Sequence, residues 1–423
     1  MPRHQSRSQD RREEPLMRVL TEPMQSTTQP LTRLTPGLRL LVYMLGGLRV
    51  GSLDLTLPDG SSRHFAGSEE GPHGVLHVKR ADIIRHVLRG GEVGFGEAYM
   101  AGCWDSPDLT ALLRVLYLNE PHYKGPYRKN PIGQLAGFIQ HRLRLRQSKA
   151  RDNIAHHYDL GNAFYRLWLD NTMAYSSAVF ADENQTLREA QINKFRHLAE
   201  RLDLQPGHHM LEIGSGWGGF AIWCAQQYGC RVTGLTLSTE QLEEARARAR
   251  DAGVADRVRF LLQDYRDHAG RYDRLASIEM YEAVGENHWK GYLDAIHSLL
   301  VPGGRAAIQG ITINPDIFDS YRRKRDFIQK YIFPGGMLCP PERFRAIAED
   351  AGLQSSDARF YGSDYARTLA IWHRNVMGCA NDIVKTFDQR FLRMWRYYLA
   401  YCECGFETGS IDLMQLTLTR PAT

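Results

Sequence analysis

Short apolar runs alternate with longer helical segments over the middle of this chain, and polar residues gather after each run. Apolar runs of this length, bounded by glycine and polar residues, predict buried strands. The predicted strands cover 209–213, 231–235, 258–262, 272–278 and 305–313. The predicted helices between them cover 220–227, a long stretch that follows the polar run 236–241 and ends at about 252, and 289–300, the last ending before Pro302-Gly303-Gly304. This alternation of strand and helix predicts a doubly wound α/β sheet.

The rest of the chain divides into regions of different character. Strand-like stretches at 53–57, 62–66 and 74–78, with helices at 81–88 and 108–118, predict a small α+β domain over 36–120. Residues 1–35 are rich in Arg, Gln, Ser, Thr and Pro and are expected to form a disordered tail. We expect a linker and a basic helix over 121–152 and the catalytic domain over 153–423. Within that domain, 316–341 and a helical stretch at 380–406 are expected to cover a substrate.

A glycine-rich turn, Gly214-Ser215-Gly216-Trp217-Gly218-Gly219, follows the first strand of the predicted sheet. Glycines at such a turn let backbone N–H groups approach a ligand, and they open a helix whose positive end faces the same place. The spacing differs from the G-x-G-x-x-G fingerprint of dinucleotide-binding domains, and a tight connection without a ligand is the alternative. The polar clusters after the strands would meet this turn at the carboxyl edge of the sheet, where doubly wound sheets bind ligands.

Several longer motifs accompany the turn in order along the chain. They are His157-Tyr158-Asp159-Leu160-Gly161-Asn162, Ala174-Tyr175-Ser176-Ser177-Ala178, Leu262-Gln263-Asp264-Tyr265-Arg266-Asp267, Met280-Tyr281-Glu282-Ala283-Val284-Gly285, Lys330-Tyr331-Ile332-Phe333-Pro334-Gly335-Gly336 and Asp364-Tyr365-Ala366-Arg367-Thr368-Leu369. With these motifs the chain resembles the class I S-adenosylmethionine-dependent methyltransferases and, within them, the cyclopropane-fatty-acid synthases. The resemblance covers about 153–415, and a weaker one covers 88–116. It implies a Rossmann-like sheet with helical insertions over the substrate.

The resemblance also implies where the methyl donor, S-adenosylmethionine, binds. The implied residues are Tyr175 and Ser176 at the methionine end, Gly214 and Gly216 under its carboxylate and amine, Thr236, Ser238 and Gln241 around the ribose, and Asp264 and Tyr265 at the adenine, with Glu212 and Trp217 beside the turn. Many methyltransferases carry an acidic residue after the second strand. This chain has Thr236 there, in keeping with the subfamily.

In the resembling enzymes the acceptor is an alkene, which attacks the electrophilic methyl carbon and becomes a carbocation. The enzyme must supply position and a dry cavity. The aromatic faces of Tyr281, Phe333 and Tyr365 are candidates to stabilise the cation, with core packing as the alternative for each. Ring closure then needs a base, which in these enzymes is a bound bicarbonate. Its implied ligands are Ser177, Glu282, Gln309, Tyr365 and the backbone of Ile311.

Two of these ligand positions depart from the usual pattern of the family. Ser177 stands where cysteine is usual, and Gln309 where histidine is usual. Both can hydrogen-bond a small anion, but Gln309 cannot carry a positive charge. The chemistry is expected to depend most on Glu282 and Tyr365. Glu282 could hold the anion, orient it through Tyr365 or act as the base itself, and a structural salt bridge is its alternative role.

The expected function is therefore methylation of the cis double bond of phospholipid acyl chains to form a cyclopropane. The alternative is the same alkylation without ring closure, which gives a methyl-branched, methylene or furan fatty acid precursor. A binding protein without catalysis, and a methyltransferase of small molecules or proteins, are further alternatives. The presence of Glu282 and Tyr365 argues against the first, and the length of the resemblance argues against the second.

Composition and charge limit which classes of partner are expected. The chain has 423 residues, 43% of them hydrophobic and 24% charged, which is typical of a globular protein of two domains. The longest apolar stretch, 40–48, is far shorter than the roughly 20 residues of a membrane span. The net charge of +5 is concentrated in basic runs at 142–151 and 322–325, which suit an anionic bilayer surface, and a solvated helix face is the alternative. Neither run has interleaved aromatic residues, so nucleic acid is not expected as a partner.

Cysteine and histidine do not suggest a metal site. The seven cysteines are an odd number that fits a reducing compartment, and the Cys402/Cys404 pair lacks a second pair. His156 and His157 would point in opposite directions in an extended segment. We expect a cytoplasmic protein, peripheral on the inner face of the membrane, and the resemblance implies a homodimer formed through the N-terminal domain.

Overall fold

The computed structural model describes residues 34–122 and 160–422. Most of the predicted tail and of the predicted linker, the basic run at 142–151 and His156-His157 lie outside these residues. None of the helices in the described ranges is long and apolar enough to cross a membrane.

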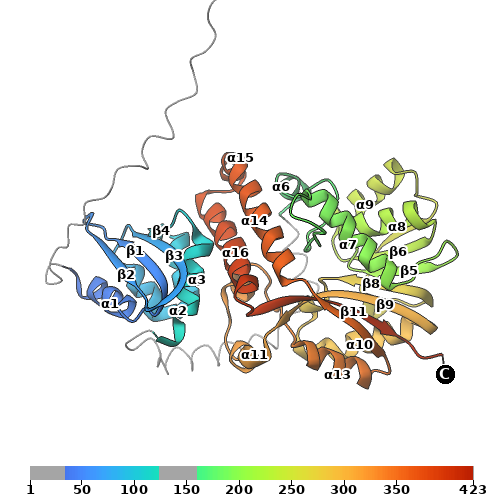
Figure 1. Cartoon of the computed structure of the whole chain (residues 1–423). Coiled ribbons are helices and arrows are strands. Elements are labelled where there is room, and N and C mark those ends of the chain that lie inside the picture. The colour runs from blue at the N-terminus through green and yellow to red at the C-terminus, as the bar shows by residue number, and fades with distance from the viewer. Residues whose placement is uncertain (1–33, 123–159, 423) are drawn as a thin grey trace, which may run out of the picture.

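A seven-stranded sheet forms the centre of the larger part of the molecule (Figure 1). Its strands are β5 (His209–Ile213), β6 (Arg231–Thr236), β7 (Val258–Leu262), β8 (Tyr272–Ile278), β9 (Leu300–Ile313), β10 (Gln354–Phe360) and β11 (Ile411–Thr419). Their order across the sheet is β10-β11-β9-β8-β5-β6-β7. Strands β5 to β9 are parallel, whereas β11 runs antiparallel to β9 and to β10. The doubly wound α/β fold predicted from the sequence is confirmed.

Helices cover both faces of this sheet and bury its apolar side chains. On one face lie α7 (Leu187–Arg201), α8 (Gly219–Tyr228) and α9 (Thr239–Asp251), and on the other lie α10 (Trp289–Leu299) and α13 (Pro341–Asp350) (Figure 1). Thr186 and Glu189 form a capping box at the start of α7, and the side chain of Ser238 caps α9. The order of the strands reverses between β5 and β8, so a crevice is expected at their carboxyl ends.

The N-terminal unit is a smaller sheet with three helices. Strands β1 (Val50–Thr56), β2 (Ser62–Ala66), β3 (Glu69–Val78) and β4 (Trp104–Asp105) pack with α1 (Pro36–Leu45), α2 (Ile83–Met100) and α3 (Leu109–Leu118). The predicted end of the helix over 81–88 is wrong. Helix α2 kinks at Gly91 (φ 57°, ψ −130°) and then continues to Met100. A Cβ on Gly94 would lie 1.9 Å from the carbonyl oxygen of His86, so the glycine permits close packing across the kink.

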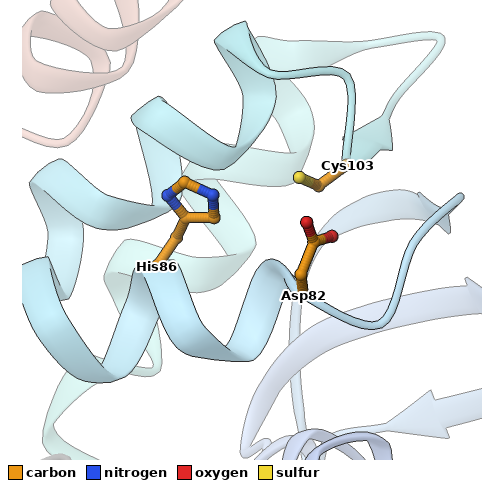
Figure 2. A group of neighbouring side chains, drawn as sticks. All are labelled: Asp82, His86 and Cys103. Atoms are coloured by element: carbon orange, nitrogen blue, oxygen red, sulfur yellow. The ribbon is translucent and has the colours of Figure 1, made fainter.

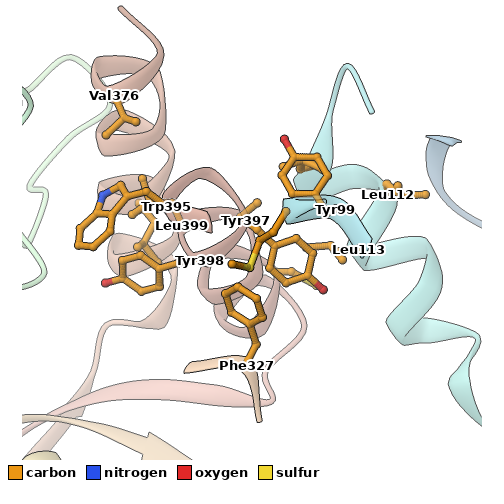
Figure 3. Close-up of a cluster of buried hydrophobic side chains, with 14 of the residues drawn as sticks. Tyr99, Leu112, Leu113, Phe327, Val376, Trp395, Tyr397, Tyr398 and Leu399 are labelled. Atoms are coloured by element: carbon orange, nitrogen blue, oxygen red, sulfur yellow. The ribbon is translucent and has the colours of Figure 1, made fainter. Parts of the chain in front are cut away.

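One continuous core joins this unit to the C-terminal helices α14 (Gly362–Gly378) and α16 (Gln389–Glu407) (Figure 3). The centroid of the Tyr397 ring lies 4.6 Å from that of Phe327 and 5.8 Å from that of Tyr99, and both ring pairs are tilted. Arg393 also donates hydrogen bonds to the carbonyl oxygens of Tyr99 and Trp104 and pairs with Asp105 at 3.1 Å. The two parts of the molecule are therefore held together by burial and by ion pairs.

The segment between β9 and β10 forms the short helices α11 (Pro315–Tyr321) and α12 (Phe327–Tyr331), as expected for an insertion. The helix predicted over 380–406 is divided into α15 (Ala380–Thr386) and α16, because Phe387 leaves the helical conformation and Asp388 caps the second helix through the N–H of Phe391. A further short helix, α6 (Asn162–Arg166), precedes the sheet.

Candidate active site

The glycine turn between β5 and α8 has the conformation that its sequence predicts. Gly214, Gly216 and Gly218 all have positive φ angles, of 83°, 52° and 79°, which side chains with a Cβ rarely adopt. A Cβ on Gly216 would meet nothing within 4 Å, because this residue borders open space. The turn therefore forms an open cradle lined by backbone at the carboxyl edge of β5.

A single cavity of about 1390 Å³ connects this cradle with the N-terminal unit. Most of the predicted site residues line it: Tyr175, Ser176, Glu212, Gly214, Gly216, Trp217, Thr236, Gln241, Asp264, Tyr265, Glu282, Ile311 and Tyr365. The structure thus brings the polar clusters after β5, β6, β7 and β8 together around one space. Ser177, Gln309 and Ser238 are not part of the lining, and all three are buried.

Residues on the donor side are held by their neighbours. The hydroxyl of Thr236 donates to Gln241 Oε1 at 2.8 Å, while the hydroxyl of Ser238 accepts from the backbone N–H of Gln241 at 3.3 Å as a helix cap. Asp264 is fixed by Arg266, whose Nη2 donates to Oδ2 at 2.6 Å. Hydrogen bonds within the protein therefore hold these side chains in place around the position that the resemblance gives to the ribose and adenine.

A buried lysine lies behind the donor side. Lys194 is completely buried, and its Nζ donates to the hydroxyl of Ser176 at 2.7 Å. Burial lowers the pKa of Lys194 to about 8, against the opposing effect of negative charge on Glu279 and Glu212. Burial raises the pKa of Glu212 to about 8, and its Oε2 has no hydrogen-bond partner among the described residues. Such an unpartnered buried oxygen at the cradle fits a ligand that brings its own donor, as the amine of S-adenosylmethionine would.

The centre of the site is a carboxylate that the sequence reasoning did not single out, Glu279. Its Oε1 accepts hydrogen bonds from the backbone N–H of Ser177 at 2.8 Å and from Nε2 of Gln309 at 2.9 Å. Its Oε2 accepts from the phenol of Tyr365 at 2.5 Å. Burial raises the pKa of Glu279, whereas these hydrogen bonds and the charge of Lys194 act in the opposite direction. Three of the residues assigned to an anion are therefore bound to a side chain of the protein itself.

Glu282 lies beside this cluster and lines the cavity. Its Oε1 accepts from the backbone N–H of Ile311 at 2.6 Å, and its Oε2 is buried without a partner among the described residues. Burial, followed by the charge of Glu279, raises the pKa of Glu282 to about 8. Because two like charges so close are unfavourable, the pair holds a proton near neutral pH, and we place it on Glu282, which has fewer donors. Within residues 34–122 and 160–422, Glu282 forms no salt bridge.

Of the three aromatic residues expected to stabilise the cation, two line the cavity and one does not. Phe333 and Tyr365 line the cavity, but Tyr281 does not. The Tyr281 ring is fully buried against Phe344, and its phenol donates to the carbonyl oxygen of Ile311 at 2.7 Å. Tyr281 therefore packs beneath the site and supports the strand that carries Ile311.

Asp82, His86 and Cys103 form the metal-like group found among the described residues, and they lie in the N-terminal unit (Figure 2). Arg80 already binds both carboxylate oxygens of Asp82, with Nη2 donating to Oδ2 at 2.5 Å. Burial raises the pKa of the Cys103 thiol to about 11, so it is protonated at neutral pH, whereas metal ligation uses the thiolate. This group is explained by an ion pair and gives no support for a metal.

A family of known proteins shares this fold and these motifs. The family described as mycolic acid cyclopropane synthetase matches residues 145–416 of the chain. The chain belongs to this family. Members of the mycolic acid cyclopropane synthetase family are S-adenosylmethionine-dependent methyltransferases, so the expectation of an enzyme of this class is confirmed, with S-adenosylmethionine as the methyl donor.

Relatives within the family carry different names. The chain is 40% identical over 359 residues to the tuberculostearic acid methyltransferase UfaA1 of Mycobacterium tuberculosis, covering 82% of this chain and 83% of that protein. It is 34% identical to the cyclopropane-fatty-acyl-phospholipid synthase of Escherichia coli K12, covering 82% and 87% of the two chains. The solved structure of the cyclopropane synthase CmaA1 complexed with SAH and CTAB superposes with a TM-score of 0.62 at 29% identity, covering 65% of this chain and 99% of that one.

Proposed function

We propose that this methyltransferase acts on the cis double bond of unsaturated acyl chains in membrane phospholipids, and that loss of a proton then closes a cyclopropane ring. The single observation that carries this proposal is the continuity of the cavity. One space joins the donor cradle at Gly214 and Gly216 to an apolar region of the N-terminal unit. At about 1390 Å³ it exceeds the range of about 300–1000 Å³ for a typical small-molecule pocket, as a donor together with a long chain would require.

The distant part of the cavity suits an acyl chain. Its lining residues there are largely apolar: Leu41, Met44, Leu45, Ile83, Val87, Phe95, Leu113 and Leu116. These side chains come from α1, α2 and α3, which share a core with α16. Burying a chain of methylene groups against them is favourable by about 0.8 kcal/mol per group. The N-terminal unit would then hold the tail of the substrate while the double bond lies near Glu279.

The rim of the cavity is basic, which favours a phospholipid as the source of the chain. Arg323 and Lys324 line the cavity and are exposed, with 68% of the Arg323 side chain accessible. Arg323 contacts the exposed Asp319 only at 3.9 Å, whereas Arg322 pairs with the less exposed Glu286 at 2.9 Å. Basic side chains near a membrane surface attract anionic headgroups by about 1 kcal/mol each. A peripheral position on an anionic bilayer would place this rim at the headgroups.

A product without a ring is the second candidate. Ser177 and Gln309 replace the usual cysteine and histidine, and the relative that is 40% identical is named a tuberculostearic acid methyltransferase. In this alternative a hydride shift along the chain precedes proton loss, and the product carries a methylene group or a methyl branch on a remaining double bond. Both candidates share the methyl transfer and differ in how the resulting cation loses its proton.

The test of acceptor class uses vesicles of defined composition. Mono-unsaturated phosphatidylglycerol vesicles are incubated with the protein and S-adenosylmethionine, with fully saturated vesicles as the matched control. We expect an acyl chain heavier by one CH₂ with the first and no change with the second. Methylation of both vesicles equally, or of neither, would contradict an alkene acceptor.

A further inference from the structure

The carboxylate of Glu279 accepts hydrogen bonds from three of the residues that the family resemblance assigns to a bicarbonate ion. The backbone N–H of Ser177, Nε2 of Gln309 and the phenol of Tyr365 all donate to it, at 2.8, 2.9 and 2.5 Å. A planar anion bound to the same donors would compete with this carboxylate for the same hydrogen bonds. The residues present therefore do not fit a separate bicarbonate, and the pocket is already supplied with an anion.

The backbone conformation of Glu279 indicates that its side chain has a functional role. Its φ angle is +50°, in the left-handed region that favours glycine and that is strained for a residue with a side chain. It directly follows β8, at the edge where the order of the strands reverses. Strain of this kind is kept where a side chain must point to a particular place, and active sites are where it gathers.

The charges around Glu279 also suit an acceptor of protons. Three hydrogen-bond donors and the nearby buried Lys194 favour its ionised form, while Glu282 beside it holds the proton of the pair. Glu279 lines the cavity together with Tyr365 and Phe333. A buried carboxylate with little access to water is a stronger base than one in solution.

We propose that Glu279 is the catalytic base of this enzyme and takes the place of the family's bicarbonate. The inference rests on the proposed function. The alkene electron pair bonds to the donor's methyl carbon as the carbon–sulfur bond breaks, and S-adenosylhomocysteine leaves. The adjacent chain carbon becomes a cation. Glu279 then accepts a proton from the transferred methyl group, and the freed C–H electron pair forms the third side of the ring, or a methylene double bond after a hydride shift.

Because glycine adopts a left-handed backbone conformation without strain, Glu279→Gly is an informative variant. Glu279→Gly removes the carboxylate, leaves the three donors free and relieves the backbone strain. Glu279→Gln removes the base but fills the same space. Asp203→Gly is the matched control, because Asp203 also has a positive φ, of 47°, and pairs with Arg274 at the opposite edge of the sheet. All four full-length proteins are assayed in carbonate-free buffer, with and without added bicarbonate, on unsaturated phosphatidylglycerol vesicles.

We expect the parent and Asp203→Gly to be indifferent to bicarbonate. Both Glu279 variants should lose about 10²–10⁴-fold in rate, the usual contribution of a general base. Added bicarbonate should restore at least a tenth of the parent rate to Glu279→Gly and nothing to Glu279→Gln. Independently of turnover, the ¹³C resonance of labelled bicarbonate should broaden with Glu279→Gly and not with the parent.

Two results would overturn the proposal. One is a parent enzyme that binds labelled bicarbonate or stops when it is removed, and the other is a Glu279→Gly variant that works at the parent rate in carbonate-free buffer. A parent that methylates no lipid under any condition would instead contradict the proposed function. The binding of labelled bicarbonate tests the role of Glu279 even in that case.

Discussion

The phenol of Tyr365 donates a hydrogen bond of 2.5 Å to Oε2 of Glu279, and this contact links helix α14 to the end of strand β8. Tyr365 is 6% exposed, and its ring stacks on Phe406 of α16 at 4.4 Å between centroids. The helices that cover the cavity therefore also position the carboxylate at its centre. Tyr365 therefore connects the helices that cover the substrate directly to the proposed base.

Replacing Tyr365 with phenylalanine should change the pH dependence of catalysis. The phenol stabilises the ionised form of Glu279, so its loss raises the pKa of that carboxyl further. A hydrogen bond to a charged group is worth about 1.5–3 kcal/mol, which corresponds to about one to two pH units. In Tyr365→Phe, the acid limb of kcat/KM should move to higher pH by that amount. Tyr361→Phe, one helical turn away, is the control, and equal profiles for Tyr365→Phe and the parent would contradict this role.

Glu282 should make the fold less stable as the pH rises. Its pKa in the folded protein is raised to about 8, mainly by burial, so the folded state retains a proton that the unfolded state releases near pH 4.5. The stability that this group contributes is present below about pH 4.5 and is lost as the pH rises through about 8. The Tm of Glu282→Gln should therefore fall less steeply than the Tm of the parent as the pH is raised from about 5 to about 9. The exposed Glu183→Gln should follow the parent, and parallel curves for all three would exclude the effect.

Two glycines of the turn should separate donor binding from stability. A Cβ at Gly216 would enter open space in the cavity, at a backbone cost of about 1–2 kcal/mol. A Cβ at Gly218 would lie 2.6 Å from the ring of Phe260 in the core. Calorimetric titration should show at least a tenfold loss of S-adenosylhomocysteine affinity in Gly216→Ala, whereas the larger fall in Tm should belong to Gly218→Ala. Undiminished affinity in Gly216→Ala would show that the cradle does not bind the donor.

The basic rim should govern attachment to anionic vesicles. Replacing both Arg323 and Lys324 with glutamine removes about 1 kcal/mol of attraction per charge, so the binding constant for vesicles, measured by cosedimentation at low salt, should fall about 30-fold. High salt should reduce the difference, because it screens exposed charges. Lys385→Gln is the control, since Lys385 is 77% exposed on α15, away from the cavity rim. An equal loss for control and double variant would remove the argument for a specific rim.

Much of the sheet could be predicted because its strands are short apolar runs with clear ends. Strands β7 and β8 have the predicted bounds. Strand β10 could not be predicted, since it is polar and exposed at the sheet edge. The sequence pattern does not predict strand β11, although its residues 413–418 are all buried, because it follows a long helix and lacks the strand–helix alternation of the central region. The sequence predicts only the first part of α2, because glycines such as Gly91 usually end a helix.

The sequence predicts where the site lies, but not which of its residues contact one another. The motif glycines and the residues after each strand do surround one cavity, whereas the partners of Glu279 come from positions as far apart as Ser177 and Tyr365. The position of Glu279 directly after a strand was a usable signal. Lys194 offered a weaker one, since it falls on the face of α7 that also carries Leu187 and Leu198. Which donors converge on which carboxylate depends on packing that no local pattern contains.

The most direct measurement uses S-adenosylmethionine with a fully deuterated methyl group and unsaturated phosphatidylglycerol vesicles, followed by mass spectrometry of the acyl chains. Removal of a proton from the transferred methyl group predicts a product that retains two deuterons, in a cyclopropane ring or a methylene group. Derivatisation of double bonds then distinguishes these two products. Retention of all three deuterons would mean that the proton leaves from the chain, and would contradict the account of this site.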